Sequence, residues 1–191
     1  MSNSFNKFLK DVAWPAAAGN VAWSFATIMI DSKLCKSAIP FLLILFILIV
    51  YLSCQWIKNL DTANTPKTWG QLLELFLVIS IVVFAISLES SAKSNIPTHS
   101  EIPAWSLFSI FLITTVGHLS GAWPPNGEGA GNIKFGLCSL IATFVVLFFN
   151  LQSSILNPWL ILACLICVLI FWLIFRTNWL SWLHFGKLNK N

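Results

Sequence analysis

Three polar residues recur along one otherwise apolar stretch, and their spacing puts them on one side of a helix. Asn20, Ser24 and Thr27 stand at positions i, i+4 and i+7, and residues at this spacing share a helix face. Such a stripe lets two helices approach closely and hydrogen-bond across their contact. It can also line a solute path or the central axis of an oligomer, since a buried Asn needs a polar partner. The stripe is a candidate pore lining or oligomer axis, with helix packing as the alternative.

Two ionisable residues, Glu74 and His118, interrupt the apolar stretches and can exchange protons. Glu74 lies about 6 Å inside its stretch at 1.5 Å per residue, and a carboxylate held in hydrocarbon is costly and often marks a proton or cation site. Histidine is the side chain whose charge changes near neutral pH, so His118 is a candidate pH-responsive gate. The alternatives are that Glu74 reaches the headgroup layer or interacts with its helix start, and that His118 is a hydrogen-bonded interfacial residue.

One connection is dense in turn-forming residues and is a candidate partner or gating loop. It runs over 121–132 and contains Asn126, Gly127, Glu128 and Gly129. The glycines do not form a phosphate loop, because no strand precedes them and no Lys-Ser/Thr pair follows. A loop of this composition suits contact with a partner, and a plain flexible linker is the alternative.

The sequence contains no set of residues that predicts catalysis, a metal site or a cofactor. No nucleophile motif such as Gly-x-Ser-x-Gly occurs. His99 and Glu101 offer two ligands, whereas a zinc site needs at least three from the protein. Cys164 and Cys167 form a C-x-x-C spacing inside an apolar stretch and are expected to be buried thiols. We expect a protein that is not an enzyme and has no metal or cofactor.

These residues are carried by six long apolar stretches, so the predicted fold is an all-α bundle of transmembrane helices in one membrane domain. Hydrophobic residues make up 57% of the 191-residue chain and charged residues 9%, and a bilayer span needs about 20 apolar residues. Short helices lying in the headgroup layer are expected at both termini. If the first stretch lay on the surface, five spans would remain. The predicted spans cover residues 12–30, 38–57, 70–88, 104–123, 133–150 and 157–175.

Basic and aromatic residues predict how the chain sits in the membrane. With six spans, eight Lys and Arg residues flank one side and three the other, so we expect both termini in the cytoplasm, in a cell membrane such as the bacterial inner membrane. Trp14, Trp69, Trp105 and Trp159 stand near predicted span ends, as interfacial tryptophans do. Trp23 is near mid-span and is expected to pack against protein.

Three functions fit these features. The first is a non-enzymatic oligomeric sensor, effector or pore-forming subunit that works with a cytosolic partner and buries the polar stripe in a homo-oligomer. The second is a small-solute permease or channel built from two inverted halves, 12–88 and 104–175. The third is an accessory or assembly subunit of a larger membrane complex. Membrane lipids are expected partners, and nucleic acid is not, because the net charge of +4 is modest and scattered.

Overall fold

The computed structural model of the chain is all-helical, which confirms the predicted class. It describes residues 2–31, 38–59, 68–93, 101–120, 122, 137, 139–145, 148 and 158–176, and no β-strand occurs among them. The candidate loop 126–129 and the predicted interfacial helix of the C-terminal tail lie outside the described residues.

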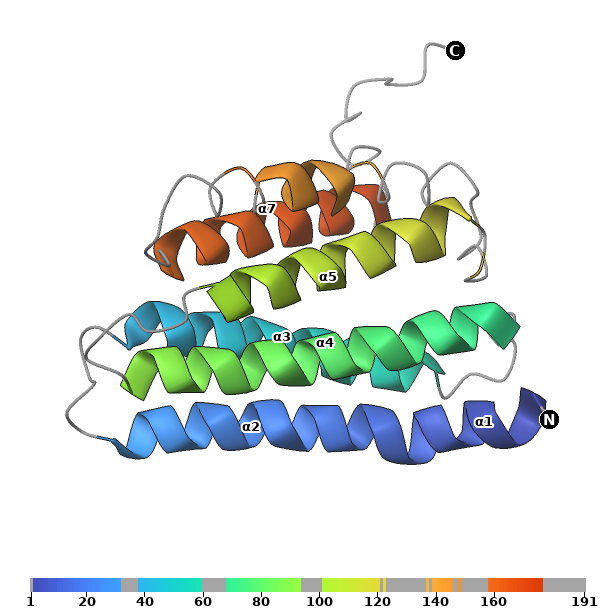
Figure 1. Ribbon diagram of the computed structural model, residues 1–191, viewed down its shortest axis with the longest axis horizontal. Coiled ribbons are helices and arrows are strands. Elements are labelled where there is room, and N and C mark those ends of the chain that lie inside the picture. The colour runs from blue at the N-terminus through green and yellow to red at the C-terminus, as the bar shows by residue number, and fades with distance from the viewer. Residues whose placement is uncertain are drawn as a thin grey trace, which may run out of the picture.

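The N-terminal helical run is longer than predicted. Helix α1 (Ser2–Phe8) leads through the π-helical segment η1 (Leu9–Ala13) into α2 (Trp14–Ile30), and the three follow one another without a turn (Figure 1). The expected separate helix in the headgroup layer is therefore not what the structure has, since no breaking residue separates Phe8 from Trp14. The π segment has a local cause, because Pro15 lacks an N–H and its ring would collide with the Asp11 carbonyl in a regular α-helix.

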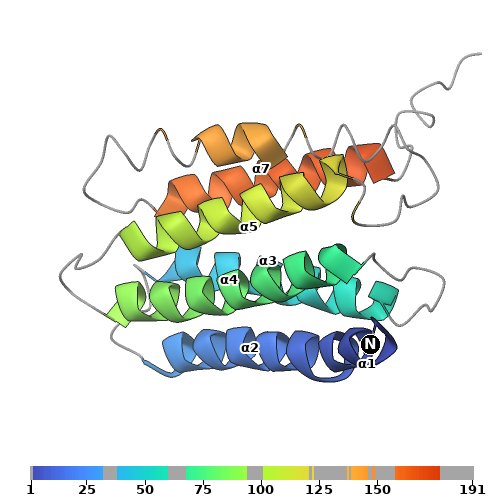
Figure 2. The same cartoon turned by 45° about the vertical axis from the view of Figure 1, so that its right-hand side comes forward.

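Four further helices complete the described bundle. They are α3 (Ile39–Asn59), α4 (Thr68–Lys93), α5 (Glu101–Leu119) and α7 (Pro158–Arg176), and residues 139–145 form a short helical piece above them (Figure 1). Helices α2 and α4 run in one direction, and α3, α5 and α7 run in the other, as both views show (Figures 1 and 2). The last residues of α7 thus lie at the same end of the bundle as α1.

Packing joins helices that are not neighbours in the sequence. Helix α4 contacts α5 and α2, while α3 contacts α2 and α7. The core between them is formed by large apolar side chains that are fully covered, among them Val21, Ile44, Ile81, Phe84 and Leu107. Because α4 lies against both α2 and α5, its inner side is covered from Gly70 to Ala92.

The structure supports the predicted spans only in part. Two described helices are long and apolar enough to cross a membrane, Thr68–Lys93 and Ile102–Leu119. Two shorter apolar stretches, Ile39–Ser53 and Pro158–Ile170, lie within α3 and α7, and α2 has 17 residues. A count of six spans is thus not established by these helices, and half of the fifth predicted stretch lies outside the described residues.

Helix α4 extends beyond the predicted range 70–88 at both ends. At its C-terminal end Lys93 Nζ donates to Glu89 Oε1 at 2.7 Å, and Ser91 donates to the Ser87 carbonyl at 2.8 Å. Pairs of opposite charge four residues apart stabilise a helix, and a sequence window that ends at the last apolar residue leaves them out.

The tryptophans divide into two groups. Trp69, Trp105 and Trp159 are exposed in the first turns of α4, α5 and α7, as their predicted place at span ends requires. Trp14 is buried instead, because the helix continues past it to Ser2. The expectation for Trp23 is wrong within this chain, since its side chain is 70% exposed.

Candidate functional site

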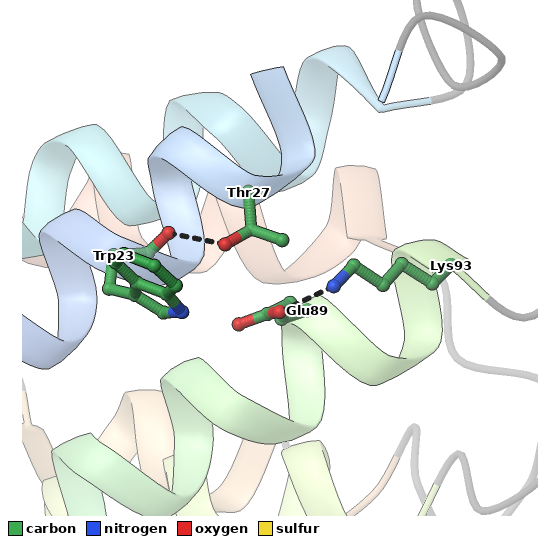
Figure 3. A network of polar contacts seen from close by, with 4 residues as sticks. All are labelled: Trp23, Thr27, Glu89 and Lys93. Atoms are coloured by element: carbon green, nitrogen blue, oxygen red, sulfur yellow. Dashed lines mark hydrogen bonds and ion pairs between the residues drawn. The ribbon is translucent and has the colours of Figure 1, made fainter. Parts of the chain in front are cut away.

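Helices α2 and α4 lie side by side and point the same way, and this contact collects most of the polar groups singled out above. Figure 3 shows Trp23 and Thr27 of α2 facing Glu89 and Lys93 of α4. Trp23 and Glu89 lie level with each other along these two parallel helices (Figure 3). Residues about 15 positions earlier in each helical run are then also level with each other. Glu74 therefore lies beside the region of η1, which contacts α4. We call this contact the α2–α4 seam.

One end of the seam holds three covered polar side chains. Asn6 is 7% exposed, Gln71 3% and Glu74 9%. They come from two segments in contact, since both α1 and η1 touch α4. Asn6 Oδ1 has no hydrogen-bond partner among the described residues. This end of the seam therefore gathers a carboxylate and two amide groups away from the surface.

Glu74 is farther from the start of its helix and more covered than the sequence indicates. Helix α4 begins at Thr68, so Glu74 is about 9 Å along its axis, where the prediction had about 6 Å. Its side chain turns into the bundle, while Leu72 and Phe76 on the opposite side are half exposed. A carboxylate so covered by protein is not placed to reach headgroups along the outer surface.

The polar stripe of α2 lies toward the other end of the seam, where Thr27 is level with Lys93 (Figure 3). Ser24 is 1% exposed, on the same side of the helix as the buried Ala17, Val21 and Ile28. The Asn20 Oδ1 and Ser24 Oγ atoms are both shielded and have no partner in the described part of the chain. Thr27 is half-buried, and its hydroxyl donates to the Trp23 carbonyl at 2.8 Å. Ser24 is thus covered by this chain itself, without a second copy.

The unpartnered Ser24 is unusual among the buried hydroxyls of this protein. Five others donate to a backbone carbonyl three or four residues earlier in their own helix, as is usual for Ser and Thr inside helices. These are Ser87, Ser106, Thr114, Thr115 and Thr143. Among the described buried hydroxyls, Ser24 and Ser139 lack such a bond, so each has its donor available for another group.

Between the polar end and the stripe, the inner face of α4 is apolar. Leu77, Val78, Ile81 and Phe84 are all at most 5% exposed. They separate Glu74 from the level of Ser24 along the helix. The far end is polar again, where the Glu89 and Lys93 side chains are 17% and 39% exposed. Along the seam a covered acid is followed by an apolar segment and then by a polar end, where the Asn20 and Ser24 oxygens without described partners lie about level with an ion pair near the surface.

The remaining candidates are more scattered. His118 is half-buried in the last turn of α5, which lies at the same end of the bundle as the start of α4 (Figure 1). No described group of three or more His, Cys, Asp or Glu side chains could hold a metal ion. Cys164 is half-buried and Cys167 exposed on α7, and both are free thiols.

Sequence reasoning missed Asn6 and Gln71. Gln71 stands one helical turn before Glu74, a spacing that puts both on one face, and this signal was available. Asn6 was not recognisable, because its burial depends on η1 carrying α1 onto α4. Comparison of the chain with protein-family models, curated proteins and solved structures gives no match.

Proposed function

We propose that this is a multi-pass integral membrane protein, without enzymatic activity, that lets protons or a small cation pass along the α2–α4 seam. The carrying observation is Glu74, an acid covered by protein inside a helix that is long and apolar enough to span a bilayer. An ionisable residue in such a helix is costly and usually serves a transport path.

The membrane location is supported by an inverted distribution of polarity. The outer side of α4 carries five half-exposed apolar residues at helical spacing, namely Leu72, Phe76, Ile79, Val83 and Ile86. The inner side carries Gln71, Glu74 and Ser87. Soluble proteins rarely expose large contiguous apolar patches, whereas a helix in contact with lipid exposes apolar side chains and keeps its polar ones inside. The shared end of α1 and α7 agrees with both termini in the cytoplasm of a cell membrane.

In this proposal the seam has three functional parts. Glu74, with Asn6 and Gln71, forms an entry site that binds a proton or cation through its oxygen atoms. The covered apolar residues of α4 form the barrier that must open for passage. Asn20, Ser24 and Thr27 form the exit together with Glu89 and Lys93, which lie level with them (Figure 3), and there a mobile charge again meets solvent or headgroups. His118 remains a candidate gate at the entry end.

A homo-oligomeric sensor or effector with a cytosolic partner is the second candidate, favoured by the outer face of α2. Ala22 and Ala26 are exposed and four residues apart, and a Cβ added at Gly19 would meet nothing within 4 Å. Small residues at this spacing let helices dimerise closely. In this version the exposed face of α2 that carries Gly19, Ala22 and Ala26 forms the contact between copies, and the polar stripe stays within each one.

The test is ion flux through liposomes containing the purified protein. A pH-sensitive dye inside reports proton entry under an imposed gradient, with sodium and potassium gradients as further arms. Glu74→Gln is expected to lower the flux at least ten-fold. Asp11→Asn is the matched control, because it removes the same charge at an exposed position of η1 that has no part in the proposed path, and should keep most of the flux. Equal loss in both variants, or wild-type flux no greater than that of empty liposomes, contradicts the proposal.

A further inference from the structure

A second internal space lies away from the seam, between α3, α4, α5, α7 and the helical piece 139–145. It is a partly open cavity of about 230 Å³. Its walls are almost entirely apolar side chains, and none of the residues around it is charged. A cavity of about 150 Å³ in a protein core holds benzene, so this one has room for about nine carbon atoms by the same proportion.

Two residues at this cavity face outward and define its mouth. Phe46 and Val50, one turn apart on α3, are 55% and 44% exposed, and both line the cavity. The deeper wall contains Ile81 and Leu165, which are at most 9% exposed. The cavity thus opens between apolar side chains on the outer surface, where a hydrophobic molecule can enter without crossing a polar layer.

The cavity also contains an unsatisfied hydroxyl. Three lining residues carry one, namely Tyr51, Thr114 and Ser139. The Thr114 hydroxyl donates to the Ile110 carbonyl at 2.7 Å. Ser139 is 0% exposed, and its Oγ has no partner among the described residues. A buried hydroxyl without a hydrogen bond is costly, and this one lies in the wall of a space large enough to hold its partner.

We infer that the cavity is a binding site for an uncharged aliphatic alcohol whose oxygen bonds to Ser139. The apolar walls bind the alkyl chain, and the Ser139 hydroxyl, which has no described partner, accounts for a single polar atom at the end of the ligand that enters first. A carboxylate or ammonium group is excluded, because no lining residue could pair with it. The alkyl chain of the ligand leaves the cavity between Phe46 and Val50, so a longer lipid alcohol fits with its tail outside the cavity. The site touches four helices at once and is separate from the seam proposed for transport.

The experiment uses 1-nonanol carrying a diazirine at its far end, photolysed with the full-length protein in nanodiscs. Labelled peptides are identified by mass spectrometry. Saturable labelling of the lining segments 46–51 and 165–169, blocked by unlabelled 1-nonanol, is expected. Nonane and nonanoate are the comparison competitors and should block at least five-fold less well, since one lacks the oxygen and the other carries a charge.

Three variants relate the labelling to the cavity. Val168→Phe fills it and should reduce saturable labelling at least ten-fold, whereas Ile166→Phe enlarges a 40% exposed residue of the same helix and should leave it unchanged. Ser139→Ala should remove the advantage of nonanol over nonane, about five-fold for one hydrogen bond. If Val168→Phe does not give a monodisperse protein, Ser139→Leu fills the cavity from the other side.

Labelling that does not saturate, spreads evenly over outward residues such as Leu72 and Phe76, or survives both filling variants overturns the inference. Glu74→Gln separates this site from the proposed transport path. It should abolish ion flux and leave nonanol labelling intact, so each proposal can fail without the other.

Discussion

The Trp14 backbone N–H donates to the Leu9 carbonyl, five residues earlier in the chain. A regular α-helix would use the residue four earlier, so one residue is accommodated in a widened turn directly before Pro15. This single turn sets the rotation of α1 relative to α2. It thereby decides that Asn6 and Leu9 lie inward, where they are 7% and 0% exposed.

Replacing the proline should change that rotation. Pro15→Ala introduces a backbone N–H that can bond to the Asp11 carbonyl, and a regular turn rotates α1 by about 100°, the angle of one residue at 3.6 per turn. We expect Asn6→Cys to react with a small maleimide at least ten-fold faster in the Pro15→Ala background than with Pro15 present. The assay uses a chain whose native cysteines are replaced by alanine. Equal rates would mean that packing of Leu9 holds the π turn without the proline.

The proposed membrane location predicts the effect of a charge on the outer face of α4. Ile79→Lys adds an ammonium group at a 49% exposed position near the middle of the helix, which should cost about 3 kcal/mol in a bilayer. We expect a large loss of protein from the membrane fraction. Ile86→Lys, two turns nearer the helix end, should be milder because its side chain can reach the headgroups. A soluble bundle would tolerate both, and recovery of Ile79→Lys in buffer without detergent would exclude the bilayer.

Ser24 offers a way to separate stability from transport. Because its hydroxyl has no described partner, Ser24→Ala should leave the free energy of unfolding unchanged or raise it by about 1 kcal/mol. If the hydroxyl contacts the moving ion, flux should fall several-fold in the same protein. Ser106→Ala is the control, since that hydroxyl is bonded within its own helix and should affect flux little. A drop in stability without a change in flux would identify Ser24 as a packing residue.

The arrangement of the helices predicts the sidedness of three labelling sites. Cysteines placed at Ser4 and at Lys190 should react from the cytoplasmic side with an impermeant maleimide, and Lys93→Cys should react from the opposite side. Ser4 lies in α1 and Lys93 is the last residue of α4, and α1 and the C-terminal end of α4 lie at opposite ends of the bundle (Figure 1), while Lys190 lies outside the described residues. The reaction is measured in spheroplasts and in inverted vesicles. Reaction of Ser4→Cys and Lys93→Cys from one side would contradict a spanning α4.

The sequence was sufficient to predict which segments are helical, but not which helices contact one another. Apolar runs predicted helical segments at α3, α4, α5 and α7, and spacing correctly put Ser24 and Asn20 near one side of α2. Periodicity says which residues share a face but not which helix covers it, so the covering of Ser24 within one chain was open. The prediction for Trp23 was wrong for the same reason. A side chain near the middle of a span is buried only if another helix lies on its side of the helix. The π turn was missed because it arises from backbone geometry around Pro15.

The parallel contact of α2 with α4 has a consequence for biosynthesis. The two helices are separated in the chain by α3, and during synthesis N-terminal segments emerge before later ones. Helix α2 and the segment carrying Asn6 are therefore already made when the ribosome adds Glu74. Asn6 is therefore synthesised before Glu74. The α1 and η1 segments that contact α4 are already present when α4 is inserted.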